Sequence, residues 1–132
     1  MQEFLVVDMR AILDLSQAGR EGAGVLEKQW NEAAAKAQGI REQAKTAAGP
    51  AQKAIMEQLQ NLEKDTTAGI EKKREELRAK VLERAQAVMR PIVESRGAKL
   101  VLDRGGIIWC SPENDITQDV IAKVDAMGPI IK

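Results

Sequence analysis

The chain has 132 residues, enough for one domain of ordinary size, but it contains only one Phe, two Trp and no Tyr. Few bulky side chains can fill a globular core, and a 30% share of charged residues among mostly small or aliphatic apolar ones favours a coiled coil. Because 20 acidic and 20 basic residues cancel, the composition argues against a general nucleic-acid binder. One Cys and no His exclude an internal disulfide and the usual zinc spacings, so we expect neither metal nor cofactor.

The N-terminal stretch FLVVD predicts a strand over about residues 4–8, apolar on both pleat faces and therefore buried on two sides. The sequence RAILDL then predicts a helical turn or two, and Ser16 to Gly19 predict a break. The start lacks the basic head and long apolar stretch of a secretory signal, and no apolar run reaches the roughly 18 residues that span a bilayer. We expect either a cytosolic protein or one whose signal has been removed.

Residues 21–96 predict a helical-hairpin arm. Gly49-Pro50 is the strongest helix stop in the middle of the chain, so the arm reverses direction at a tip over about 48–51. On either side of the tip, apolar residues recur at heptad spacing and form a seam along each helix. The seam of the second helix is polar around Thr66 and Lys73, which predicts loose pairing in mid-arm. The first seam comprises Leu26, Trp30, Ala33, Ala37, Ile40, Ala44 and Ala47; the second comprises Ile55, Leu59, Leu62, Thr66, Ile70, Leu77, Val81, Ala85, Val88 and Ile92.

The C-terminal part predicts a C-cap at Gly97, then strands over about 99–103 and 107–110 joined by a tight turn at Arg104-Gly105-Gly106. A helix follows over about 116–127, capped by Asp115 together with Gln118. The predicted fold is α+β: a long antiparallel helical hairpin attached to a small three-stranded β body, formed by residues 1–20 and 97–132, with a C-terminal helix. One helix protects too little of such a sheet, so we expect oligomerisation.

The two ends of the chain resemble the Skp/OmpH-like family of periplasmic chaperones. The similarity lies in FLVVDMRAIL followed by SQAG, and in KLVLDRGGIIWCSPENDITQDVI after a charged coiled coil. The resemblance implies a homotrimer in which strands of three chains build one β body, and arms that enclose a central cavity. It further implies an ATP-independent holdase, without catalytic residues, that binds unfolded outer-membrane β-barrel proteins in the periplasm.

The resemblance also gives roles to individual regions. Lys45 and Lys53 flank an arm tip that has no acidic residue between Glu42 and Glu57, which predicts a positive tip and a weak peripheral contact with anionic membrane or lipopolysaccharide. The family members compared are strongly basic, whereas this chain is neutral, and this departure argues against a strong contact of that kind. Weak apolar contacts interspersed with Lys and Arg suit a holder of many unfolded sequences. The expected client-binding residues are Ile40, Lys45, Lys53, Ile55, Met56 and Leu59; the expected oligomerisation residues are Leu5, Val7, Val101, Ile107, Ile108 and Trp109.

Several alternatives remain open from the sequence. Ile40 and Leu59 can instead fill the seam between the two helices, and Trp30 is assigned to packing rather than to binding. A structural or adaptor coiled-coil oligomer would share nearly every feature of the arm. FLVVDM also resembles the first strand of isochorismatase-like hydrolases, for which Asp8, Lys99 and Cys110 would be the formal catalytic set.

Overall fold

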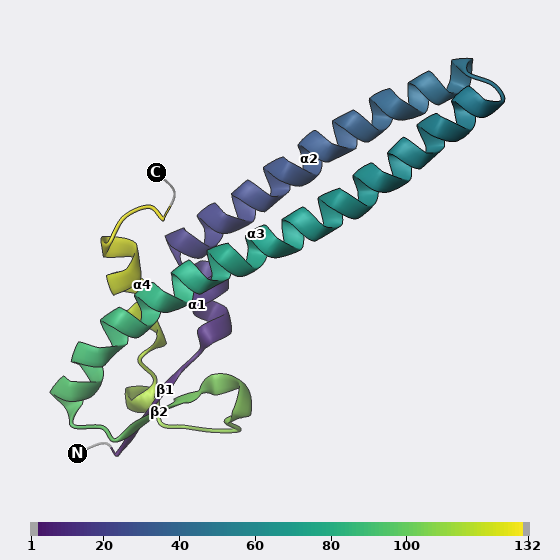
Figure 1. The fold of residues 1–132 in the computed structure, drawn as a ribbon. Helices are drawn as coiled ribbons and strands as arrows, with labels where there is room; N and C mark the ends of the chain where they lie inside the picture. Colours follow the sequence, from purple (N-terminus) through teal and green to yellow (C-terminus); the bar gives the residue numbers. More distant parts are fainter. Residues whose placement is uncertain (1–2, 131–132) are drawn as a thin grey trace. The chain divides into compact units, whose positions relative to one another are not determined.

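The computed structural model describes residues 3–130 and is mostly helical. The chain divides into two compact units, which we call the body (residues 1–22 and 77–132) and the arm (residues 23–76). Two long helices run from one unit into the other (Figure 1). In chain order the elements are β1 (Phe4–Val7), α1 (Met9–Leu15), α2 (Gln17–Thr46), α3 (Pro50–Arg96), β2 (Leu100–Asp103), the short 3₁₀ turns η1 (Arg104–Gly106) and η2 (Pro112–Asn114), and α4 (Thr117–Ala126).

The arm is an antiparallel pair formed by the later part of α2 and the earlier part of α3 (Figure 1). The reversal lies where the sequence predicts it. Gly49 takes a φ of +62°, a left-handed conformation that favours glycine, and Pro50 begins α3 with a ring that suits the first helical position. The predicted helical hairpin is confirmed.

The heptad seam accounts for the burial within the arm. Ala37 and Ala44 of α2 are 7% and 8% exposed, and Leu59 and Ile70 of α3 are 7% and 2% exposed. Between residues 50 and 76 every side chain outside the predicted seam and Lys73 is exposed. The seam prediction is therefore confirmed, with one exception: Trp30 lies on the seam but remains 47% exposed.

The body core surrounds β1, which is apolar on both faces, as the sequence predicts. Leu5 and Val6 are fully buried and Val7 is 3% exposed. The later part of α3 contributes buried side chains to the body, so its surplus length over α2 lies there. The other fully or nearly fully buried apolar residues of the body are Ile12, Ala18, Val81, Ala85, Ile116, Val120 and Val124.

The sheet differs from the predicted three-stranded patch, because residues 107–110 form no strand. β1 pairs in parallel with β2, Phe4 opposite Leu100 and Val7 opposite Asp103, and these are the two strands of the sheet in the described residues. On the other edge of β1, Val6 bridges to Asp115. Both edges of β1 are thereby occupied within the chain, whereas the outer edge of β2 has no partner strand among the described residues, because residues 107–110 do not return alongside it.

The predicted hairpin turn is also wrong. Arg104 to Gly106 form a 3₁₀ turn closed by a hydrogen bond from the Ile107 amide to the Arg104 carbonyl, 3.0 Å long. Neither Gly105 nor Gly106 takes a positive φ, whereas a two-residue hairpin turn of the favoured types needs at least one. The chain consequently leaves the sheet after Asp103 rather than returning alongside β2.

The break between α1 and α2 is a single residue, Ser16, which forms hydrogen bonds to both helices. Its amide donates to the Ile12 carbonyl at the end of α1, and its hydroxyl accepts from the Gly19 amide at 3.0 Å in the first turn of α2. Ser16 is fully buried, so its hydroxyl replaces water as a partner for that amide. The predicted break at Ser16 to Gly19 is thus narrower than expected.

The two remaining helix ends follow local sequence. Gly97 has a φ of +68° after α3, and the Ala98 amide reaches the Val93 carbonyl at 3.1 Å, which confirms the predicted C-cap. At the start of α4, Asp115 accepts a hydrogen bond from the Thr117 amide at 2.9 Å rather than pairing with Gln118. α4 extends over Thr117–Ala126, slightly shorter than predicted, and buries Val120, Ile121 and Val124.

Candidate functional site

The predicted arm residues divide into a buried and an exposed set. Leu59 is 7% exposed in the seam, and Ile40 and Ile55 are half-buried beside it, so in the single chain these side chains pack between the helices. Met56 is 46% exposed on the surface of α3. Lys45 and Lys53 are also exposed. The six residues lie in the outer half of the arm, but only Met56, Lys45 and Lys53 are exposed.

Trp30, which the sequence analysis assigns to packing, is less buried than a seam position predicts. Its indole, 47% exposed, borders a groove of about 400 Å3 that is otherwise lined mainly by small residues and by the aliphatic Leu62. An ion pair between Arg41 of α2 and Glu63 of α3, 3.7 Å apart, lies along the same groove. The sequence contains an indication of this exposure, since an alanine-rich seam facing Thr66 offers little apolar surface to cover an indole.

The charge at the arm tip is smaller than the sequence suggests. Lys45 donates to Glu42 at 3.0 Å on the same helix, so its charge is partly compensated. Lys53, in the first turn of α3, has no ion pair among residues 3–130. The tip is therefore weakly positive, and both charges are solvated.

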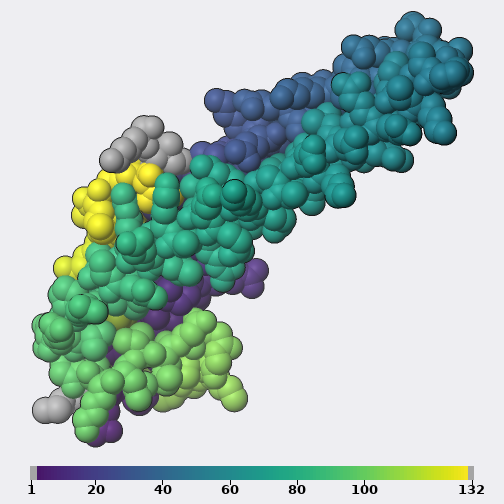
Figure 2. All heavy atoms as spheres, in the orientation of Figure 1, coloured from purple at the N-terminus to yellow at the C-terminus, as the bar shows by residue number. Residues whose placement is uncertain are grey.

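The predicted oligomerisation residues also divide into two sets. Leu5 and Val7 are buried within the chain's own core. Val101 and Ile107 are half-buried, whereas Ile108 is 101% and Trp109 is 77% exposed. In Figure 2 the light-green segment around residues 104–110 forms a lobe on the surface of the body.

Three further apolar side chains of the small sheet are exposed, and the sequence analysis did not single them out. Phe4 is 40%, Leu100 is 49% and Leu102 is 39% exposed. Leu102 also borders a groove of about 530 Å3 lined by Val7, Met89, Val93 and Val101, with Arg90, Glu94 and Asp103 among its polar residues. We call this groove, together with Phe4, Leu100, Ile108 and Trp109, the apolar surface of the body. Exposed large apolar side chains that gather in one unit are typical of surfaces that bind a partner.

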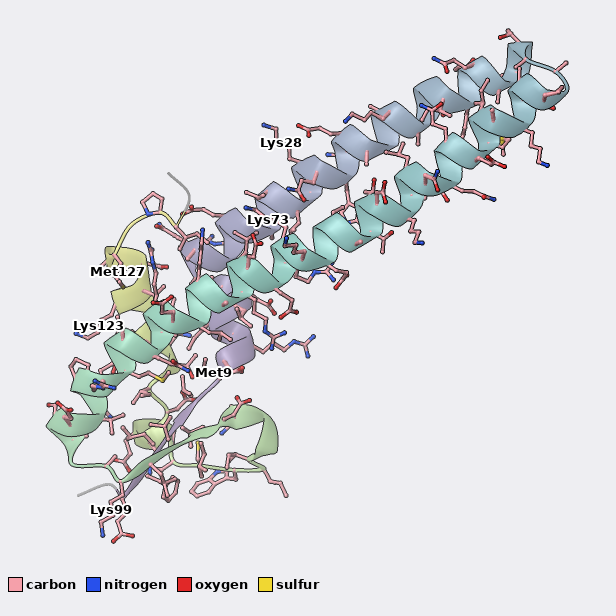
Figure 3. The ribbon with its side chains drawn as sticks, viewed as in Figure 1. Met9, Lys28, Lys73, Lys99, Lys123 and Met127 are labelled. Atoms are coloured by element: carbon pink, nitrogen blue, oxygen red, sulfur yellow. The ribbon has the colours of Figure 1, made fainter. Side chains whose placement is uncertain are left out.

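The formal hydrolase set does not assemble. Because β1 and β2 are parallel, Asp8 follows the end of β1 whereas Lys99 precedes the start of β2, at the opposite end of the sheet. In Figure 3 the labelled Lys99 and Met9 mark these two ends. Asp8 caps α1 by accepting from the Ala11 amide at 3.0 Å, and Cys110 accepts a hydrogen bond from Arg104 at 2.9 Å. These contacts give both residues local structural roles.

Metal-binding groups and membrane-spanning helices are both missing from the described residues. Within residues 3–130, no group of three or more His, Cys, Asp or Glu side chains could hold a metal ion. No helix in this part of the chain is long and apolar enough to cross a membrane. The described chain thus combines a paired helical arm with a small α+β body that exposes apolar side chains.

Comparison with known proteins identifies the family. The family model described as "Outer membrane protein (OmpH-like)" matches residues 3–124, and the chain therefore belongs to the OmpH-like family. This confirms the resemblance seen in the two ends of the sequence. The family is non-enzymatic, which sets the hydrolase alternative aside.

A solved structure shares the fold. It is a crystal structure from Caulobacter crescentus described as that of an outer membrane chaperone (OmpH-like), with a TM-score of 0.72 at 16% sequence identity. The alignment covers 96% of this chain and 86% of that one. A search of curated proteins found no match.

Proposed function

We propose that this protein is an ATP-independent holdase chaperone that binds unfolded outer-membrane β-barrel proteins and prevents their aggregation in the periplasm. The family match over residues 3–124 supports this assignment, as does the likeness to the Caulobacter chaperone. Holding an unfolded chain needs no bond chemistry. It needs surface that is apolar enough to bind weakly and polar enough to stay soluble.

The observation that carries the proposal is the way the arm distributes its apolar groups. The seam buries Leu59 and Ile70, whereas Trp30 and Met56 leave about half of their surface in water, at 47% and 46%. Both side chains are adaptable contacts, an indole with a large flat face and a thioether on an unbranched stem. The charged residues around them can cover a bound chain with their stems while their charges stay hydrated.

The proposed assembly is a homotrimer whose arms enclose the client in a central cavity. The apolar surface of the body supports an assembly of copies of this chain, because Phe4, Leu100 and Leu102 are exposed on the small sheet and Ile108 is fully exposed in the segment that follows it. β2 is also an edge strand whose outer backbone groups are free to pair with another strand. Neighbouring copies would cover both features.

Contact with an anionic membrane or with lipopolysaccharide is proposed as a weak accessory interaction of the arm tip. Lys53 has no acidic partner in the described chain, and Lys45 shares its charge with Glu42. With few charges per arm and a neutral chain, binding should require several arms at once and should fall steeply with salt.

The deciding experiment dilutes a denatured β-barrel outer-membrane protein into buffer with and without this protein and follows light scattering, without nucleotide. We expect scattering to be suppressed at about one assembled chaperone per client. An unrelated coiled-coil protein of equal concentration serves as the control. Full aggregation at a several-fold excess of the assembled protein would contradict the holdase proposal.

The same experiment tests the second candidate, a structural or adaptor coiled-coil oligomer. That candidate is favoured by one observation: Ile40, Ile55 and Leu59 already fill the seam of the arm, which leaves few apolar side chains for a client. An adaptor would form the same oligomer by sedimentation but would give no protection against aggregation.

A further inference from the structure

The last described residues of the chain, Asp125–Ile130, begin immediately after the residues that match the family model, which end at 124. They comprise the end of α4 and the segment that follows it, marked in Figure 3 by Met127. Ile130 is only 8% exposed, so the end of this segment packs against the body, whereas Met127 is 50% exposed. We call it the strap.

The strap bonds to the first residue of α2. The Asp125 carboxylate accepts a hydrogen bond of 2.7 Å from the Gln17 amide, and Gln17 begins that helix. The first amides of a helix have no partner within it, and a carboxylate beside them is also favoured by the helix dipole. Asp125 thus supplies from the C-terminus a cap that complements the one from Ser16.

Asp125 has an unfavourable position in its own helix. It lies in the last turn of α4, where the dipole disfavours an acidic side chain and favours a basic one such as Lys123. A carboxylate at this place is explained by its contact with α2 and not by the stability of α4. Removing the charge of Asp125 should therefore favour α4, whereas removing the charge of Lys123, in the same turn, should disfavour it.

The strap also bonds to α3. Both terminal nitrogens of Arg84 donate to strap carbonyl oxygens, one to Gly128 and the other to Pro129 at 2.9 Å. Gly128 takes a φ of +84°, which favours glycine, and the turn there presents both carbonyls to the guanidinium fork. One short segment therefore contacts both long helices within the body.

We propose that the strap clamps the body ends of α2 and α3 together and so limits how freely the two helices separate where they leave the body. Releasing it would loosen the strap and the first turn of α2 while leaving the sheet intact. The clamp acts within one chain and does not depend on client binding.

Hydrogen exchange of the full-length protein, resolved by residue or short peptide, tests the clamp with Asp125→Ala and Arg84→Met. We expect Asp125→Ala to speed exchange of the first-turn amides of α2 about fivefold, because one helix cap is lost. Arg84→Met keeps the aliphatic stem and should speed exchange of residues 126–130 and of α2's first turn by a similar factor.

The matched controls are Lys123→Ala and Arg78→Met, at exposed positions of α4 and α3. If Asp125 acted only on its own helix, Asp125→Ala would slow exchange in α4 and leave α2 unchanged, and that result would overturn the clamp. Equal acceleration at β1, α2 and α4 would mean global unfolding and would also overturn it. Acceleration confined to α2's first turn and the strap, with both controls within about twofold of the parent, would support it.

Discussion

Gly19 approaches the main-chain carbonyl of Leu13 so closely that a Cβ at position 19 would lie 1.7 Å from the oxygen. This contact explains why the chain can leave α1 and enter α2 with only Ser16 between them. Any side chain at position 19 would force apart two helix ends that Ser16 caps, with its amide at the end of α1 and its buried hydroxyl at the start of α2.

Gly19→Ala should lower the free energy of unfolding by about 3 kcal/mol, because the clash is with backbone that cannot rotate away. Urea unfolding followed by circular dichroism measures the effect. Gly24→Ala is the matched control, since nothing lies within 4 Å of its added Cβ and the helix should gain up to about 1 kcal/mol. Equal effects of the two substitutions would contradict the close-contact explanation.

Leu59→Ala and Trp30→Ala should separate the seam of the arm from its surface. Leu59 is 7% exposed, so its truncation should destabilise the arm by about 2–4 kcal/mol. Trp30 is 47% exposed, so its truncation should cost about 1 kcal/mol or less while weakening the capture of an unfolded β-barrel protein severalfold.

Thermal unfolding and client titration, measured on the same samples, test these two substitutions. Trp30→Ala with unchanged client affinity would remove Trp30 from the proposed contact surface. Ala51→Gly provides a control for helix stability that removes no large apolar side chain from the arm.

Ile108→Ser combined with Trp109→Ser should dissociate the proposed trimer while leaving the body folded. The two side chains are 101% and 77% exposed in the single chain, so their loss removes little burial within it. Sedimentation across a concentration series should show a shift toward monomer. Leu15→Ser, at a side chain that is 56% exposed but remote from this segment in sequence, should leave the assembly unchanged. An unaltered trimer in the double variant would place the interface elsewhere.

Lys53→Gln should weaken binding to anionic vesicles, because Lys53 is the tip cation without an acidic partner in the described chain. Lys45→Gln should have the smaller effect, since Glu42 already compensates part of that charge. Flotation with phosphatidylglycerol vesicles at low salt measures both, and binding of the parent should be largely lost at about 0.5 M salt. Neutral phosphatidylcholine vesicles are the control, and equal binding to them would rule out a charge-driven contact.

The helical hairpin could be predicted because its determinants are local. The heptad spacing around Ala37 and Leu59, and the stops at Gly49-Pro50 and Gly97, each act over a few residues. The apolar run of β1 likewise indicates burial on both faces, which the fully buried Leu5 and Val6 confirm. For these elements the sequence pattern and the packing lead to the same structure.

The body could not be predicted in the same way, because its pairing joins residues from the two ends of the chain. The Ile116 amide donates to the Val6 carbonyl at 2.9 Å, so the outer edge of β1 is taken by a segment 110 residues away in sequence. The high β-propensity of IIWC predicts a strand that the structure lacks, since propensity does not determine whether the preceding turn, here the 3₁₀ turn at Arg104–Gly106, brings the segment back beside β2.

By itself, the sequence determined the long paired helices, their turn and the buried first strand, because periodicity and backbone restrictions at glycine and proline operate locally. Only the tertiary structure decided the parallel pairing of β1 with β2, the exposure of Trp30 and Trp109, and the bonds of Asp125 and Arg84 to distant residues. These features depend on which groups meet in space, and a side chain is buried or exposed according to the neighbours that the whole fold brings to it.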